Sequence, residues 1–284
     1  MRPNPPTLRV VVIGSKVVCC LPEMCRLVLA LAHRQLMILL IGLLLVSPTV
    51  IFASDPSPLS TDMQQYSTRF HENPSRLREI REELERRIKT NSHMEYLVAL
   101  AKVCFILGDV LATTDIQKAD AFERGRQVAE RAVELEPKNV SARFWYASNT
   151  GRWGQSKGFL RSLFLVPTVK KEINIILKLD PNFTPAYALA GNFFYEVPGL
   201  FGGDLDKAEE MFRKGLEQDS TFTGLRVGLA KTLIKKGRDK EAQQQLQAVL
   251  DEKEPRNLAY WTLKDSKEAQ ELLDSIKKRS EARD

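Results

Sequence analysis

The fold is decided in residues 184–220, which read TPAYALAGNFFYEVPGLFGGDLDKAEEMFRKGLEQDS. In the first part, apolar and small residues fall on one helix face, at Tyr187, Ala190, Gly191 and Phe194. The last part has the same periodicity, at Ala208, Met211, Phe212 and Leu216. Asp204 stands where a helix N-cap is expected. The stretch therefore predicts two antiparallel helices joined by a glycine-rich elbow, with Gly191 and Ala208 allowing close approach of the backbones.

The order aromatic, small residue, aromatic, then Ala-x3-Phe resembles the tetratricopeptide repeat. A regular repeat of ~34 residues would place Ala208 about 12 residues after Gly191, but the gap is 17, so about five residues are inserted in PGLFGG. The phrases VELEPKN, LKLDPNF and LEQDSTF recur at intervals of 44 and 39 residues. We therefore expect an all-α fold, an α-solenoid of tetratricopeptide-like hairpins with inserted elbows, preceded by an N-terminal apolar signal or anchor helix.

A second insertion lies in residues 148–167, which are rich in aromatic and basic side chains. We expect a short extra helix over residues 158–165 that packs its apolar side across the solenoid. For Trp153 the sequence leaves packing and a partner contact equally open. The phrase GRWGQSKG lacks the order of a phosphate-binding loop, and no strand is expected before it.

The N-terminal region carries one long apolar run, residues 37–53, with Arg34 upstream and a polar, proline-rich segment after it. This layout is typical of a secretory signal or a membrane anchor. Cleavage after Ala53 and retention as an anchor both stay open. The predicted organisation is a poorly defined extension (1–36), the signal or anchor (37–53), a linker (54–61) and the repeat domain (62–284). The expected location is periplasmic, or membrane-anchored facing the periplasm.

Composition limits the function classes. The first 53 residues hold five Lys/Arg and one Glu, which leaves 37 of the 42 basic and 35 of the 36 acidic residues in the rest of the chain. Such balance argues against a nucleic-acid partner. The three histidines and the single body cysteine, Cys104, form no catalytic or metal-binding motif. We therefore expect no enzyme activity, no catalytic residues, no metal and no cofactor.

Three phrases extend the resemblance: RFWYASNTGRWG, the stretch from LDPNF to KGL around the elbow, and AYWTLKDSKEAQELL. They resemble the tetratricopeptide-like T component associated with tripartite ATP-independent periplasmic (TRAP) transporters. That resemblance implies an extracytoplasmic helical protein that meets the transporter's solute-binding subunit, with self-association into a homo-oligomer left open. The regulator of microtubule dynamics family has similar repeats, but the export-like segment 37–53 argues against that role.

Two modes of binding follow from these patterns. A protein partner would contact polar and aromatic residues on the first helices of the hairpins, at Phe144, Asn149, Tyr187, Asn192 and Tyr195. For Phe144 and Tyr187, packing within the repeat is the favoured interpretation. We expect the elbow residues Leu200 and Phe201 to insert into a groove against residues 148–167 or into a partner. The alternative is a small hydrophobic ligand in a pocket walled by Trp153, Phe159, Leu200 and Phe201.

Overall fold

The computed structural model describes residues 9–13, 16–20, 66–90 and 93–282. The chain divides into two compact units, residues 1–55 and 56–284. In the first unit, strands β1 (Arg9–Ile13) and β2 (Lys16–Cys20) form an antiparallel hairpin with Arg9 opposite Cys20. The predicted signal or anchor and the linker lie outside the described residues, and the proposed boundaries stay a prediction.

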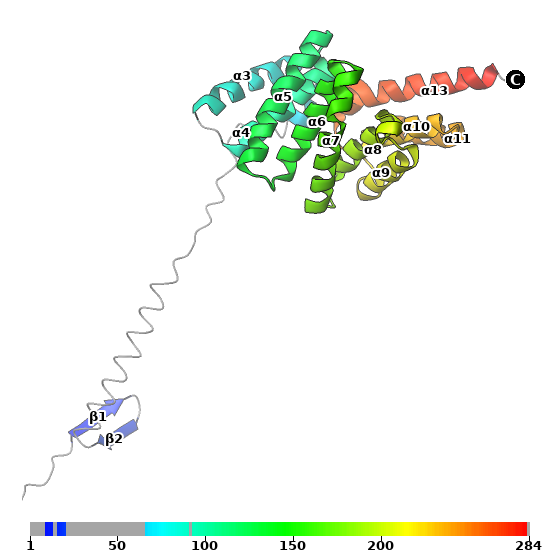
Figure 1. The fold of residues 1–284 in the computed structure, drawn as a ribbon. Coiled ribbons are helices and arrows are strands. Elements are labelled where there is room, and N and C mark those ends of the chain that lie inside the picture. The colour runs from blue at the N-terminus through cyan, green and yellow to red at the C-terminus, as the bar shows by residue number, and fades with distance from the viewer. Residues whose placement is uncertain (1–8, 14–15, 21–65, 91–92, 283–284) are drawn as a thin grey trace, which may run out of the picture. The chain divides into compact units, whose positions relative to one another are not determined.

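The second unit is built of helices that follow one another as antiparallel hairpins (Figure 1). Its longer helices are α3 (Pro74–Thr90), α4 (Met94–Ile106), α5 (Asp115–Leu135), α6 (Val140–Ser156), α7 (Phe159–Leu179), α8 (Thr184–Glu196), α9 (Leu205–Gln218), α10 (Thr223–Lys235), α11 (Asp239–Asp251) and α13 (Ser266–Glu281). Short helical turns complete it: η1 (Leu107–Leu111), η2 (Gly199–Phe201), α12 (Leu258–Tyr260) and η3 (Trp261–Asp265). Every regular element in the described part of this unit is helical, which confirms the predicted all-α solenoid.

Side-chain caps fix where several helices begin. The side chain of Thr114 accepts a hydrogen bond from Gln117 N, and that of Asn139 accepts one from Ala142 N. The Asp204 carboxylate accepts bonds from the backbone N–H groups of Asp206 and Lys207, which confirms the predicted cap. Each such cap stabilises its helix by roughly 1 kcal/mol. The caps therefore fix where α5, α6 and α9 begin.

The central hairpin packs through small residues, as its sequence predicts. Ala208 and Phe212 are fully buried on α9. The Phe212 ring lies against Gly191 of α8 and Gly228 of α10, where a β-carbon would come within 2.5 Å of the ring. Glycine is therefore required at both positions to let one aromatic ring fill the junction of three helices.

The C-terminal segment returns from the last hairpin to the first helices. Tyr260 packs edge-on against Phe70 at 5.6 Å, while the side-chain amide of Asn257 donates to the carbonyl of Ser67 at 2.9 Å. Ala259 belongs to the same hydrophobic cluster as α3, α4 and α5. Trp261 packs with the cluster of α9, α10 and α11. The segment therefore contacts two of the three hydrophobic clusters in the described part of the repeat domain.

The second insertion differs from the predicted extra helix. Residues 159–179 form one continuous helix, α7, with Pro167 inside it. The inserted residues instead lengthen α6 and α7 to 17 and 21 residues, against 13 for α8, α10 and α11. Continuation of a helix satisfies more backbone hydrogen bonds than a second short helix would, which is the physical reason for the difference.

Candidate interaction surface

The elbow between α8 and α9 is a single defined turn. Gly202 has φ of 104°, a left-handed conformation that favours glycine, and its N–H donates to the carbonyl of Gly199 at 3.0 Å. A β-carbon on Gly203 would collide with the backbone of Val197. The N–H of Asp204 donates to the carbonyl of Phe194 at 2.8 Å, which closes the turn onto α8. The inserted glycines thus fold the elbow into a short, fixed protrusion.

The apolar side chains of the elbow point away from the rest of the chain. Leu200 is 96% exposed and Phe201 is 48% exposed. The prediction that both residues insert into a groove against residues 148–167 is therefore wrong for this chain by itself. The turn puts Leu200 at its tip, where the helices behind it offer no cover. Insertion into a partner, the other half of that prediction, stays open.

The start of α7 exposes a second group of large apolar side chains. Phe159, Leu160 and Phe164 are 61%, 70% and 80% exposed. Leu160, Phe164 and Pro167 are spaced by four and three residues, so they share one face of the helix. We call Phe159, Leu160, Phe164, Leu200 and Phe201 together the apolar end surface.

Both parts of the apolar end surface lie at the same end of their hairpins. The side-chain amide of Gln155, near the end of α6, donates a hydrogen bond to Glu196 at the end of α8. A β-carbon built on Gly202 of the elbow would lie 3.8 Å from the Nζ atom of Lys170 on α7. The two insertions that lengthen the repeat therefore project from neighbouring positions.

Trp153 is part of the repeat's packing rather than of the exposed surface. It is 9% exposed, and its ring lies between the guanidinium groups of Arg126 and Arg161, with ring-to-cation distances of 5.0 and 5.1 Å. Such stacking stabilises a buried indole by roughly 0.5–2 kcal/mol. Of the two interpretations that the sequence left open, the structure favours packing.

The remaining predicted binding residues do not form one exposed surface. Phe144 packs edge-on against Phe183 at 5.4 Å, and the Tyr187 hydroxyl donates to the carbonyl of Pro181 at 2.9 Å. Asn149 is fully buried, and its amide donates to the carbonyls of Ala101 and Trp145. These contacts agree with packing within the repeat.

Two of the predicted residues keep part of their surface open. The Tyr195 ring lies under the ammonium group of Lys235 at 3.7 Å, and Asn192 is half-buried on α8. Neither residue belongs to the apolar end surface. The sequence pattern identified the first helices correctly but could not show which of their side chains face neighbouring helices.

The cavities do not match the predicted ligand pocket. A surface cavity of about 800 Å³ lies between α3 and α5, with Leu107, Leu111 and Ala121 on its apolar side and Arg78 and Lys89 among its charged residues. A second, of about 490 Å³, lies along α13. Neither is lined by Trp153, Phe159, Leu200 or Phe201.

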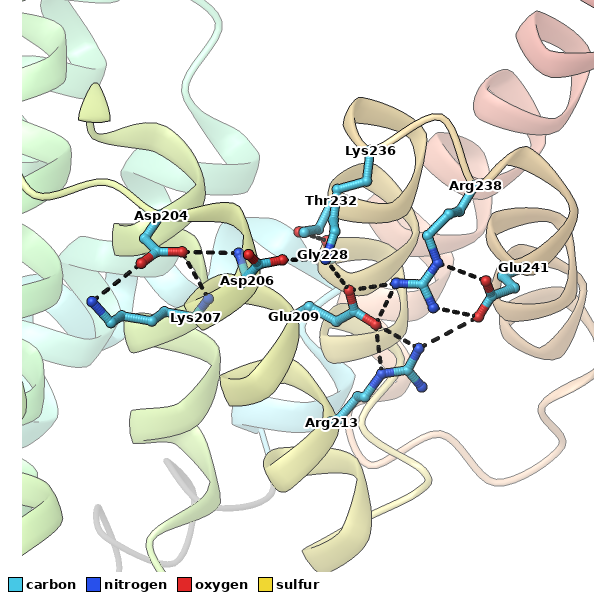
Figure 2. Close-up of polar contacts among 10 residues, drawn as sticks. All are labelled: Asp204, Asp206, Lys207, Glu209, Arg213, Gly228, Thr232, Lys236, Arg238 and Glu241. Atoms are coloured by element: carbon cyan, nitrogen blue, oxygen red, sulfur yellow. Dashed lines mark hydrogen bonds and ion pairs between the residues drawn. The ribbon is translucent and has the colours of Figure 1, made fainter. Parts of the chain in front are cut away.

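A network of charges holds the elbow's helix to the next hairpin (Figure 2). Glu209 of α9 is buried and accepts hydrogen bonds from Arg213, Lys236 and Arg238 at 2.7–2.9 Å. Burial alone would raise the pKa of Glu209, but the bonds from Lys236, Arg213 and Arg238 lower it to about 2. Arg238 also binds Glu241 in a bidentate pair. The network fixes the position of α9, and hence of the elbow before it.

Charges in this network are balanced, which argues for a structural role. Three acids, Asp206, Glu209 and Glu241, face three cations, Arg213, Lys236 and Arg238 (Figure 2).

Within the described ranges no cluster of three or more His, Cys, Asp or Glu residues is placed to hold a metal ion. Among those same residues, no helix is long and apolar enough to cross a membrane.

Comparison with known proteins identifies the repeat type. The sequence profile of a tetratricopeptide repeat matches residues 202–266. The crystal structure of TTC0263, a thermophilic TPR protein of Thermus thermophilus, superposes with a TM-score of 0.56 at 17% identity, covering 76% of this chain and 98% of that one. The chain is a tetratricopeptide-like repeat protein. Proteins of this type are generally non-catalytic scaffolds for protein–protein interaction.

The first half of the repeat domain matches a second sequence profile. The profile described as "Regulator of microtubule dynamics protein 1-3" matches residues 63–201. Regulator of microtubule dynamics protein 2 from Macaca fascicularis is 28% identical over 104 residues, and that from Mus musculus is 28% identical over 112 residues. These matches cover 37% and 39% of this chain but only about a quarter of the relatives, 25% and 27%. The resemblance to the TRAP-associated T component is not confirmed, and the profile of the family that was set aside on the apolar segment matches residues 63–201.

Proposed function

We propose that this repeat protein is a non-catalytic adaptor that binds a protein partner through the apolar end surface. The observation that carries the proposal is the exposure of five large apolar side chains, between 48% and 96%, on two inserted segments at one end of the hairpins. Groups of large exposed apolar side chains on a soluble protein mark sites of association. The elbow's hydrogen-bonded turn presents Leu200 in a fixed geometry, which lowers the entropic cost of binding.

Burial of these side chains against a partner would contribute a substantial part of the binding free energy. Fully burying a Leu or Phe side chain contributes roughly 1.5–3 kcal/mol. Replacing Leu200 and Phe201 by Ser should therefore weaken partner binding by at least about tenfold, since 1.4 kcal/mol is a factor of ten in affinity. The helices should remain formed, because both side chains are exposed.

Two partner classes follow from the similarities. The name of the matching relatives suggests a microtubule partner, and the profile that carries it covers residues 63–201, which end at the elbow. The elbow phrase suggests the solute-binding subunit of a TRAP-type transporter, in which case the protein acts outside the cytoplasm. We propose the microtubule class first, because a sequence profile supports it. Self-association through the same surface would instead give a homo-oligomer.

The test is co-sedimentation of the full chain with purified, stabilised microtubules. We expect Leu200→Ser/Phe201→Ser to reduce the bound fraction, while Ile116→Ser, a change at a comparably exposed apolar residue on α5, leaves it unchanged. Equal binding by the wild type and the double variant would overturn the role of the end surface. If the wild type does not sediment, the same three proteins are tested against the solute-binding subunit and by light scattering for oligomers.

Location is tested separately. We propose that residues 37–53 direct or anchor the repeat domain at a membrane. An alkaline phosphatase fused after residue 60 is active if the domain is exported, and a cytoplasmic reporter at the same position is active if it is not. The mature N-terminus, read by mass spectrometry, separates cleavage from retention.

A further inference from the structure

The hairpin of α6 and α7 carries charge of one sign along most of its length. Residues 137–171 contain seven Lys and Arg residues and no Asp or Glu. Two of the seven are paired within the fold, Arg143 with Glu172 at 2.5 Å and Arg152 with Asp109 at 3.3 Å. The other five are exposed: Lys138, Lys157, Arg161, Lys170 and Lys171. The exposed surface of this hairpin is therefore positive.

Four of these cations surround the apolar end surface. Lys157 lies between the end of α6 and Phe159, the first residue of α7. Lys171 follows Phe164 by seven residues, so it lies on the same face of α7. The Nζ atom of Lys170 would lie 3.8 Å from a β-carbon on Gly202 of the elbow. The positive charges thus lie next to both inserted segments.

Arg161, the fourth cation, is held in place by a buried ring. Its guanidinium lies 5.1 Å from the centre of the Trp153 ring, and Trp153 is 9% exposed. The guanidinium makes no ion pair with any residue that the structure describes. An ordered guanidinium with free N–H donors binds a carboxylate in a bidentate pair at a reduced entropic cost. Arg161 is therefore suited to anchor an acidic group of a partner.

The acidic side chains close to the elbow already have partners. Three lie between residues 192 and 207, and each pairs with a cation: Glu196 with Arg152 at 3.8 Å, Asp204 with Lys207 at 3.1 Å and Asp206 with Lys236 at 2.5 Å. In contrast, four cations around the apolar end surface form no ion pair within the described part of the chain: Lys157, Arg161, Lys170 and Lys171. The charge left without a partner at this end of the hairpins is positive.

An anionic bilayer also attracts exposed apolar and cationic side chains. Its interface favours Trp and Tyr, whose rings are amphipathic. The apolar end surface consists of Phe and Leu only, while Trp153 is packed within the repeat. The hydrogen-bonded elbow and the stacked Arg161 suit a partner whose own groups are fixed in space. These observations favour a protein over a lipid surface.

Building on the proposed function, we propose that the partner of the apolar end surface is an acidic protein surface, in which Asp and Glu carboxylates rim an apolar pocket. The pocket receives Phe164 and Leu200, which are 80% and 96% exposed. Arg161 pairs with one carboxylate, and Lys170 and Lys171 attract the rest of the rim. Such complementarity speeds association and excludes apolar partners that lack the acidic rim.

The test compares two pairs of lysines in the full chain, by co-sedimentation with stabilised microtubules. Lys170→Gln/Lys171→Gln removes two charges near the elbow. Lys138→Gln/Lys178→Gln is the matched control, because it removes two exposed lysine charges at the other end of the same hairpin. We expect the first pair to raise Kd about three- to tenfold and the control to change it by less than about twofold. Raising the salt from about 50 to about 300 mM should weaken the wild type more than the first variant.

The lysine pairs and the apolar variant separate this proposal from the proposed function. Equal binding by the two lysine variants, with Leu200→Ser/Phe201→Ser still weakened, would overturn the acidic partner and leave the adaptor role standing. Unchanged binding by Leu200→Ser/Phe201→Ser, or no binding by the wild type to any partner named above, would overturn both. If a partner other than microtubules binds, the same variants are compared on it, with the same readings. Flotation with phosphatidylserine vesicles that Lys170→Gln/Lys171→Gln abolishes would overturn a protein partner in favour of a bilayer.

Discussion

Packing of Phe212 against two glycines makes a quantitative prediction about the central hairpin. In Gly228→Ala, the added β-carbon would lie 2.5 Å from Cζ of the Phe212 ring, closer than real atoms approach. The ring is fully buried and the same edge rests on Gly191, so it has little room to move. Overpacking of this kind costs about 1–3 kcal/mol. Alanine in a helix interior is favoured over glycine by about 1 kcal/mol, which offsets part of that cost.

We therefore expect Gly228→Ala to lower the free energy of unfolding by about 1 kcal/mol, the difference between these two effects. In a Phe212→Leu background the smaller side chain makes room for the β-carbon. There the same substitution should raise stability by up to about 1 kcal/mol. Gly151→Ala on α6 is the matched control, because its nearest contact would be 3.9 Å from Val169. It should stabilise the protein in both backgrounds.

Urea unfolding followed by circular dichroism measures the four proteins of this cycle and the control. The decisive quantity is the coupling between positions 212 and 228, for which contacting residues typically give 0.5–3 kcal/mol. The reasoning is refuted if Gly228→Ala has the same effect in both backgrounds, since the ring would then not be what excludes the β-carbon. If a second probe of unfolding, such as fluorescence, gives a different transition from circular dichroism, unfolding is not two-state, and only the transition that includes α8, α9 and α10 is compared.

Three further predictions concern buried side chains. Burial raises the pKa of Asp265 from 3.8 to about 6, so the folded state binds the proton more tightly, and stability should fall by about 2 kcal/mol as the pH rises from 4 to 6. Asp265→Asn should flatten that slope in urea unfolding across this range. The lowered pKa of Glu209 has the opposite effect on the pH dependence of stability. The stability that the ionised Glu209 contributes is present above pH 4.5 and is lost as the pH falls toward 2. Glu209→Gln should cost about 1.5–3 kcal/mol at pH 7, and a loss equal to that of the exposed-site variant Glu210→Gln would contradict the network in Figure 2. Ala208→Trp should cost at least about 1–3 kcal/mol because Ala208 is fully buried between helices, and an unchanged melting temperature would mean that the helix pair is wrongly registered.

The sequence by itself determined the local features of the repeat. Helix periodicity and the small residues Gly191 and Ala208 predicted the central hairpin, and the spacing between them predicted the inserted elbow. The cap at Asp204 was readable because it depends only on the N–H groups of Asp206 and Lys207, two and three residues further along the chain. Exposure of Leu200 was not readable, because whether a neighbouring helix covers a turn depends on the paths of both segments.

Only the tertiary structure decided how distant segments meet. Lys264 of η3 contacts Asp109, 155 residues away, and Asn257 contacts Ser67, 190 residues away. Trp153 is buried because Arg126 and Arg161, from α5 and α7, lie on its ring. Each hairpin adds a small rotation to the solenoid, and the sum of these rotations decides which residues face the inner side. That sum arises from the packing of all the helices together, whereas the period of a helix is set within each turn.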